Sequence, residues 1–183
     1  MAAEPARELD ELTLIRAQRG EEPACRALVE RYQRPVFALV SRLLGHGPQV
    51  EDTAQDTFLR AFRALPTFDR RGPARLSTWL LTIATRLCLD ELRRHAPVSE
   101  PLEDHAELPA PERTDAAGLQ KPLQRALSAL QPDYRAAFLL REAHGFSTAE
   151  VARALGVEEG TVKSRLSRAK AALREALEEP GHD

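Results

Sequence analysis

Apolar residues recur at helical spacing along most of the chain, and the alternating pattern typical of strands is missing. Residues 9–15 predict a short helix that Gly20 ends. Residues 23–44 predict a longer helix, and Pro35 lies inside it, where we expect a kink or the start of a new segment. Because β-branched runs at alternating spacing are absent too, the pattern predicts an all-α protein.

The next two helical patterns are joined by a basic loop. Residues 50–65 place their apolar side chains on one face and carry acidic residues in the first turn, where carboxylates favour the positive end of the helix dipole. Residues 66–75 predict the loop. A helix then spans 77–94, with Ser77 as its expected N-cap and Trp79 facing inward.

Residues 96–118 differ in composition from the rest of the chain. Proline, acidic residues and alanine dominate there, and large apolar residues are nearly absent, so we expect a flexible acidic linker rather than a folded element. Helical patterns resume at 119–130 and 132–145. The sequence therefore predicts two small helical domains, residues 1–95 and 119–179, joined by this linker.

A helix-turn-helix pattern occupies residues 147–179. Ser147 and Glu150 have capping-box spacing, and Gly156 can adopt the left-handed conformation that ends a helix. The last helix is expected to span 158–179, with Val162, Leu166, Ala169, Leu173 and Leu177 facing inward. The polar face of this helix carries hydrogen-bond donors that suit a DNA major groove. We predict that the DNA-contacting residues are Thr161, Lys163, Ser164, Arg165, Ser167 and Arg168.

Charge is distributed unevenly along these 183 residues, although the formal net charge is only -2. Residues 60–95 hold eight basic and three acidic side chains, and residues 161–174 hold five basic and none that are acidic. Residues 96–118 hold one basic and six acidic side chains. Two basic surfaces around an acidic connector indicate two nucleic-acid contacts. Trp79 near basic residues would suit single-stranded DNA, although it fits a core position better.

The sequence offers little support for catalysis, a metal or a cofactor. Cys25 and Cys88 are too few for a disulfide framework. The five histidines lack the spacing of metal ligands; they are His46, His95, His105, His144 and His182. No glycine-rich phosphate loop or activated nucleophile is recognisable. No signal peptide or membrane-spanning run is apparent. We therefore expect a cytoplasmic protein that is not an enzyme and needs no cofactor or metal.

Three segments in order resemble the extracytoplasmic-function sigma factors of bacterial RNA polymerase. They are EDTAQDTFLRAF, STWLLTIATRLCLDELRR and a long final block that contains GTVKSRLSRAK. The resemblance covers nearly the whole chain. It implies that residues 1–95 form sigma region 2 and residues 119–179 form sigma region 4, and that the protein directs promoter-specific transcription initiation in response to a stress or environmental signal.

The resemblance also implies partners and roles for particular residues. Core RNA polymerase would be bound through the clamp helices of its largest subunit and the flap of its second-largest subunit, and an anti-sigma factor would inhibit the protein. The implied clamp-binding residues are Asp52, Gln55, Asp56, Phe58, Leu59 and Arg60. The implied minus-ten residues, which would read and melt promoter DNA and accept a flipped base, are Phe68, Arg70, Arg71, Arg75, Trp79, Thr82, Thr85, Arg86 and Arg93. Residues 158–174 would read the minus-thirty-five element. Family members often have Asn at the position of Arg86.

Two other function classes remain open on the residues alone. A repressor or activator that binds its operator as a dimer would explain Lys163 and Arg168 but gives residues 50–94 no role. A protein-interaction adaptor would need no DNA contact from either residue.

Overall fold

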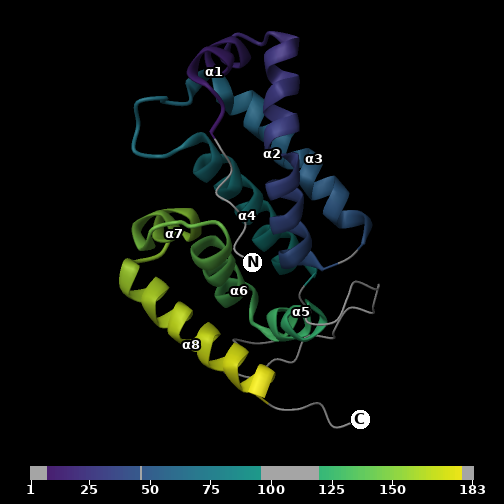
Figure 1. Cartoon of the computed structure of the whole chain (residues 1–183), viewed down its shortest axis with the longest axis vertical. Coiled ribbons are helices and arrows are strands. Elements are labelled where there is room, and N and C mark those ends of the chain that lie inside the picture. The colour runs from purple at the N-terminus through teal and green to yellow at the C-terminus, as the bar shows by residue number, and fades with distance from the viewer. Residues whose placement is uncertain (1–7, 46, 96–119, 179–183) are drawn as a thin grey trace.

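The computed structural model describes residues 8–45, 47–95 and 120–178, and within these ranges it contains helices and no strand. The all-α prediction is confirmed. The N-terminal half forms α1 (Glu11–Gln18), α2 (Glu22–Leu44), α3 (Pro48–Ala64) and α4 (Leu76–His95). The C-terminal half forms α5 (Gln120–Ala129), α6 (Pro132–Phe138), α7 (Thr148–Leu155) and α8 (Glu159–Glu178), as Figure 1 shows. The expected linker, residues 96–118, lies outside the described residues.

Helix α2 runs without interruption through Pro35, where the sequence suggested a kink or a new segment. Proline deprives only the Arg31 carbonyl of its helical partner, and Arg31 is exposed. Val36 and Leu39, which follow the proline, are fully buried. Packing of this apolar face therefore outweighs one lost backbone hydrogen bond.

Helix α4 begins at Leu76, so the expectation that Ser77 serves as the N-cap is wrong. Ser77 lies in the first turn, and its hydroxyl bonds the carboxylate of Glu8. The same carboxylate accepts from the Ser77 amide at 3.4 Å and from the Tyr32 hydroxyl at 3.1 Å. A distant acid thus supplies the negative charge that favours a helix N-terminus, and it ties the segment before α1 to both α2 and α4.

The helix-turn-helix forms as the sequence predicted. Both hydrogen bonds of the capping box are present, from the Glu150 amide to Ser147 Oγ (3.2 Å) and from the Ser147 amide to Glu150 Oε2 (2.7 Å). Gly156 has φ 68°, which confirms the left-handed turn. One detail differs: Leu177, which was expected to face inward, lies in the last turn of α8 and is 49% exposed, whereas Leu173, one turn earlier, is buried.

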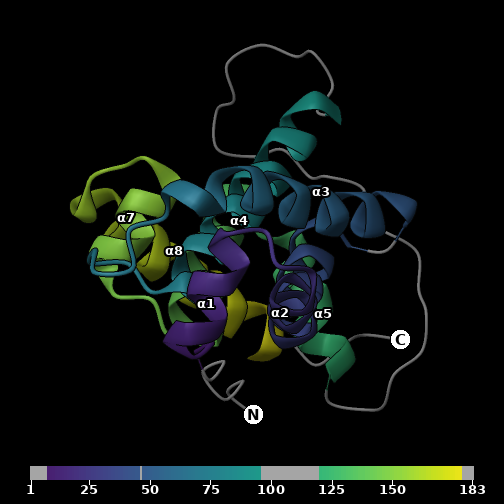
Figure 2. The same ribbon diagram turned by 90° about the horizontal axis from the view of Figure 1, so that it is seen from above.

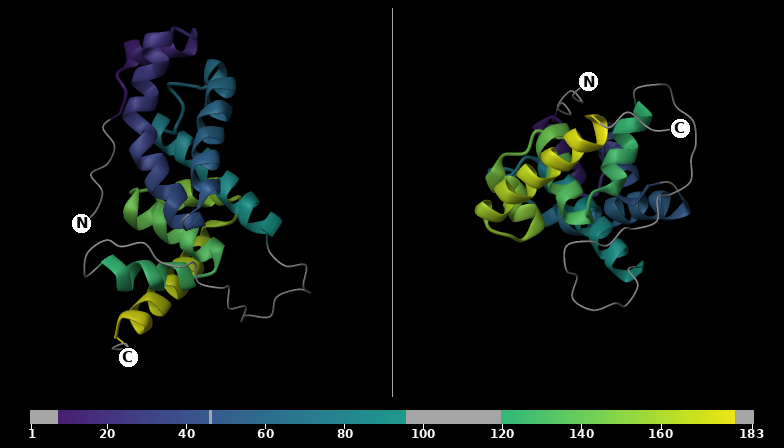
Figure 3. Two further views of the ribbon diagram at one scale, coloured as in Figure 1. Left: turned by 90° about the vertical axis from the view of Figure 1, so that its right-hand side faces the viewer. Right: turned by 90° about the horizontal axis from the view of Figure 1, so that it is seen from below.

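The two halves pack directly against each other, which the sequence did not suggest. Buried apolar side chains from both halves form one core. Helix α4 contacts α6 and α7, and α2 contacts α5 and α6. Figures 2 and 3 show the C-terminal helices lying along the side and lower end of the bundle of α1–α4.

Two arginines hydrogen-bond across this contact between the halves. The Arg86 guanidinium, from α4, donates to the carbonyls of Ala154 (3.1 Å) and Arg153 (2.9 Å) at the C-terminal end of α7. Arg135, from α6, donates to the Leu43 carbonyl at the end of α2 (2.9 Å). Cations favour helix C-termini because the carbonyls there have no partner within the helix and the dipole is negative.

Candidate nucleic-acid interfaces

Helix α8 presents most of its predicted DNA-contacting residues to solvent. Thr161, Lys163 and Ser167 are exposed, and so are Ser164 and Arg168. The first turns of α8 follow the tight turn at Gly156, as in a recognition helix whose N-terminal part enters a major groove. The exposed face combines one cation early in the helix with hydroxyl donors, so it can contact both phosphates and base edges.

Two arginines of α8 are already engaged within the protein. Arg165 is half-buried and forms an ion pair with Asp133 at 3.3 Å. Arg168 donates to the Tyr134 hydroxyl at 2.8 Å. Both partners lie in the first turn of α6, so these contacts position α8 against its own domain. Arg165 therefore helps to position α8 and does not offer its guanidinium to DNA in this arrangement.

The loop between α3 and α4 forms one wall of a cavity of about 500 Å³. The cavity is lined by Gln18, Pro66, Phe68, Asp69, Arg70 and Arg71. Phe68 is half-buried, and its ring packs against Trp79, with centroids 5.0 Å apart. Trp79 thus supports the floor of the loop from the core side. A cavity that holds arginine donors beside an aromatic ring has the chemistry needed to hold an unstacked base.

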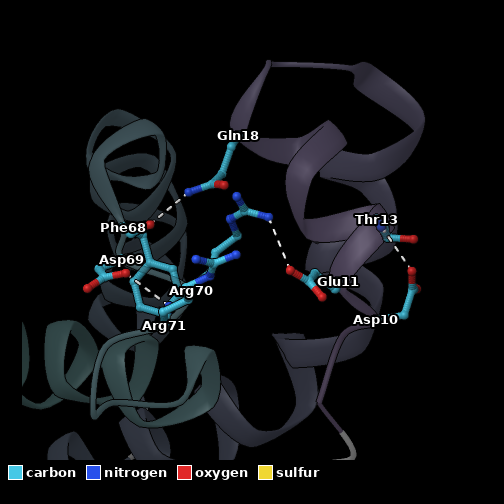
Figure 4. Close-up of polar contacts among 8 residues, drawn as sticks. All are labelled: Asp10, Glu11, Thr13, Gln18, Phe68, Asp69, Arg70 and Arg71. Atoms are coloured by element: carbon cyan, nitrogen blue, oxygen red, sulfur yellow. Dashed lines mark hydrogen bonds and ion pairs between the residues drawn. The ribbon is translucent and has the colours of Figure 1, made fainter.

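Helix α1 forms the opposite wall of this cavity, which Figure 4 shows in close-up. Gln18 Nε2 donates to the carbonyls of Leu65 (3.0 Å) and Phe68 (2.8 Å). Arg70 Nη1 forms an exposed ion pair with Glu11 at 3.4 Å. Sequence reasoning missed Gln18 because a single glutamine on a short helix carries no motif, and only the fold brings it to the loop.

Along α4 the predicted minus-ten residues occupy three kinds of environment. Arg75 and Arg93 are exposed, although Arg93 lies 3.5 Å from Asp90. Thr82 is half-buried and bonds the Thr78 carbonyl. Thr85 is fully buried and bonds the Leu81 carbonyl at 2.8 Å, so in this arrangement it is a packing residue. The Arg86 guanidinium is occupied at the end of α7.

Helix α3 presents a third candidate surface, which is acidic with one apolar residue. Asp52, Gln55 and Asp56 are exposed, as is Arg60, and Leu59 is 53% exposed. Phe58 is half-buried and packs on the core. Carboxylates repel DNA phosphates, so this acidic surface suits a protein contact better than a nucleic-acid contact. Phe37 of α2 is also exposed, at 47%.

His144 is a partly buried titratable group that is affected by the charge of Arg42 in the other half. Its Nε2 is buried and has no hydrogen-bond partner among the described residues. Burial, together with the charge of Arg42 from α2, lowers the pKa of His144 to about 4. The imidazole is therefore neutral in the folded protein at neutral pH.

Acidification should destabilise the protein through His144. The unfolded histidine takes up a proton near pH 6.5, whereas the folded one stays neutral down to about pH 4. Stability is therefore lost as pH falls through this window, by about 1.5 kcal/mol between pH 6.5 and 5. Urea unfolding of wild type and His144→Leu at both pH values measures the difference. An equal pH dependence of stability in wild type and His144→Leu would contradict the assignment.

The described residues give no sign of a metal site or a membrane helix. Among them, no three His, Cys, Asp or Glu side chains are grouped so as to hold a metal ion. None of the described helices is long and apolar enough to cross a lipid bilayer.

Two family models match the chain, one for each half. Sigma-70 region 2 matches residues 28–97, and Sigma-70, region 4, matches residues 120–173. The ECF RNA polymerase sigma factor SigE of Mycolicibacterium smegmatis is 37% identical over 85% of this chain, which spans 62% of that protein's length. The RNA polymerase sigma-H factor of Pseudomonas aeruginosa is 31% identical over 93% of this chain and 95% of its own length.

One solved structure extends the similarity to three dimensions. It is the sigma factor RpoE of Bartonella quintana in complex with the anti-sigma factor NepR. The similarity has a TM-score of 0.65 and 28% sequence identity, and it covers 85% of this chain and 98% of that one.

Proposed function

Because the chain belongs to the extracytoplasmic-function sigma factors of RNA polymerase, we propose that it binds core RNA polymerase in the cytoplasm and directs it to promoters, with no catalysis of its own. Residues 1–95 act as sigma region 2, residues 119–179 as sigma region 4, and residues 96–118 as the tether between them. Tethering makes the second DNA contact intramolecular, so two weak readers act as one strong reader.

The exposed face of α8 is the observation that carries this proposal. A capped helix, a left-handed glycine turn and a second helix with exposed Lys163 fit a reader of the minus-thirty-five element. Thr161, Ser164 and Ser167 supply hydroxyls to phosphates or bases. Arg168 contributes a guanidinium at the same face, and Arg165 keeps the helix in position through Asp133.

The loop after α3 and the start of α4 read the minus-ten element. The cavity between the loop and α1 takes an unpaired base, with Phe68 as a stacking surface and Arg70 and Arg71 as donors to the base or its phosphates. Arg75 and Arg93 follow the strand along α4, with Trp79 and Thr82 behind them. Thr85 supports this helix from the core. Arg86 reaches DNA once it leaves the carbonyls of α7.

Helix α3 docks on the polymerase. Its exposed Leu59 and the acidic residues around it suit a basic and apolar groove such as the clamp helices of the largest subunit. Asp52, Gln55, Asp56 and Arg60 form the rim of this contact, and Phe58 anchors it to the core. The C-terminal half binds the flap of the second-largest subunit.

An anti-sigma factor is the proposed inhibitor. The RpoE structure similar to this chain is a complex with the anti-sigma factor NepR, which supports an inhibitory partner of that class. Such a partner would stabilise the packed arrangement of the two halves, in which α4 faces α7. A stress or environmental signal would release it.

Run-off transcription with purified protein and core polymerase on a promoter library tests the proposal. Initiation should depend on the protein. Lys163→Ala should lower activity or discrimination at the upstream element by about fivefold to tenfold, the effect of one lost base or phosphate contact. Arg26→Ala, which removes an exposed cation paired with Glu22 on α2, is the matched control and should be neutral.

Failure of the folded protein to initiate on any template would count against the sigma-factor assignment. Two-fold symmetric operator binding without polymerase would instead favour a dimeric repressor or activator. Unchanged upstream preference in Lys163→Ala would remove α8 as the reader of that element.

A further inference from the structure

The Gln18 amide is fixed in one orientation by two backbone carbonyls. Its Nε2 donates to Leu65 O at 3.0 Å and to Phe68 O at 2.8 Å. Both partners are acceptors, so the nitrogen must face them, and the amide assignment follows from the hydrogen bonds themselves. The two amide hydrogens are thereby used, and Oε1 remains as the only polar atom that Gln18 offers to another group.

This oxygen belongs to the wall of the cavity between α1 and the loop after α3, which we call the base cavity because it is proposed to hold a flipped nucleotide base. Gln18 lines the cavity together with Phe68, Arg70 and Arg71. Figure 4 shows the amide oxygen turned away from Phe68 and toward the Arg70 side chain. Arg70 itself is held by Glu11 at 3.4 Å, and the Arg71 amide donates to Asp69 Oδ1 at 2.9 Å. The cavity therefore presents the fixed Gln18 amide oxygen and the Asp69 carboxylate as acceptors, beside guanidinium donors.

We propose that Gln18 is a specificity-determining residue of this cavity and accepts a hydrogen bond from the exocyclic amine of a flipped base. On the Watson–Crick edge, an amine beside an unprotonated ring nitrogen occurs at C6 of adenine and at C4 of cytosine; guanine has this pair only at C2 and N3, on a different edge. The amine pairs with Gln18 Oε1, and the ring nitrogen accepts from Arg70 or Arg71. When the same edge enters the cavity, thymine presents O4 and guanine presents O6 at the position of the amine, and either carbonyl would face the amide oxygen and repel it. Helix α1, which lies outside the matched region 2 segment, thus becomes part of the minus-ten reader.

This inference rests on the proposed function, because it needs a flipped base in the cavity. It also gives Gln18 two separable roles. Its nitrogen positions the loop through Leu65 and Phe68, and its oxygen reads the base. A purely structural glutamine would affect binding of every base equally, whereas a reading glutamine makes binding depend on the amine.

The test uses holoenzyme, assembled from the full chain and core polymerase, on promoter fragments with an open minus-ten region. At each position, adenine is compared with purine, and cytosine with 2-pyrimidinone, so that only the exocyclic amine is removed. At one position wild type should lose about threefold to tenfold in affinity, the value of one neutral hydrogen bond. Gln18→Met, which keeps the volume and removes the amide, should bind both members of each pair equally well.

The readout is the ratio of the affinities that one protein has for the two members of a base pair set, such as adenine and purine. A loosened loop that weakens binding of every base equally leaves this ratio unchanged. Gln18→Asn, which keeps the amide but shortens the side chain, should show a reduced ratio. Glu22→Gln, which breaks the exposed ion pair with Arg26 on α2, is the matched control and should keep the wild-type ratio. Equal amine dependence in wild type and Gln18→Met, or none at any position in wild type, would overturn the assignment. Absence of a holoenzyme complex on every fragment would overturn the proposed function and this inference with it.

Discussion

Locking α4 against α7 should reduce promoter-directed transcription by at least about tenfold, because a locked molecule cannot use both DNA readers. In the observed arrangement the Arg86 guanidinium lies 2.9 Å from the Arg153 carbonyl. The minus-ten and minus-thirty-five elements are about 25 base pairs apart, or about 85 Å along B-form DNA at about 3.4 Å per base pair. Two readers in direct contact cannot span that distance on straight DNA.

The tether is long enough for the separation that promoter binding requires. Residues 96–119 can reach about 80 Å when fully extended, and the domains add their own width. Opening would break the two Arg86 bonds and the bond from Arg135 to Leu43, and it would expose apolar surface that both halves now share. Binding of polymerase to each half supplies the free energy for this exchange.

Arg86→Cys combined with Arg153→Cys, in a Cys25→Ser background, allows the locking experiment. Cys88 is fully buried and can remain. A short bis-maleimide joins the two halves, whereas a monofunctional maleimide modifies the same positions and leaves them separable. Activity of the two products is compared in run-off transcription, so any cost of losing Arg86 appears in both. Equal activity would show that the halves need not part.

The local structure followed closely from the sequence, since local rules determine it. The capping box at Ser147, the left-handed Gly156 and the apolar faces of the helices depend on residues within one or two turns. The continuation of α2 through Pro35 was missed because burial of the flanking residues, which the pattern does not quantify, decides the outcome. The role of Ser77 was missed because its partner, Glu8, lies far away in sequence.

The candidate sites divide in the same way. The exposed cations on α8 could be predicted from periodicity and charge, because their exposure depends only on which face of that one helix packs on the core. The base cavity needs α1 beside the loop after α3, and no local pattern pairs Gln18 with Phe68. Packing of the two halves was also unpredictable, because Arg86 and Arg135 bind backbone carbonyls, which any residue can supply.

Replacing Arg135 with Met should lower the free energy of unfolding by about 3 kcal/mol, because buried carbonyls would lose their donors. Arg135 is buried, and its guanidinium donates to Leu43 O (2.9 Å), Ser128 O (2.6 Å) and Leu130 O (2.9 Å). Burial lowers the pKa of Arg135, yet the group stays charged at neutral pH. Relief of that desolvation offsets part of the loss, which is why the expected value is well below the sum of three charged hydrogen bonds.

Urea unfolding of Arg135→Met measures this loss, and two further variants divide it. Arg141→Met is the matched control: Arg141 also donates to a backbone carbonyl, that of Phe146 at 2.7 Å, but it is exposed, so water can replace it and the loss should stay below about 1 kcal/mol. Arg135→Lys keeps a cation near the ends of α2 and α5 but cannot reach all three carbonyls, so it should fall between wild type and Arg135→Met. A loss in Arg135→Met no larger than that in Arg141→Met would mean that water satisfies the carbonyls of Leu43, Ser128 and Leu130. Apolar packing and the Arg86 hydrogen bonds would then hold the halves together without Arg135.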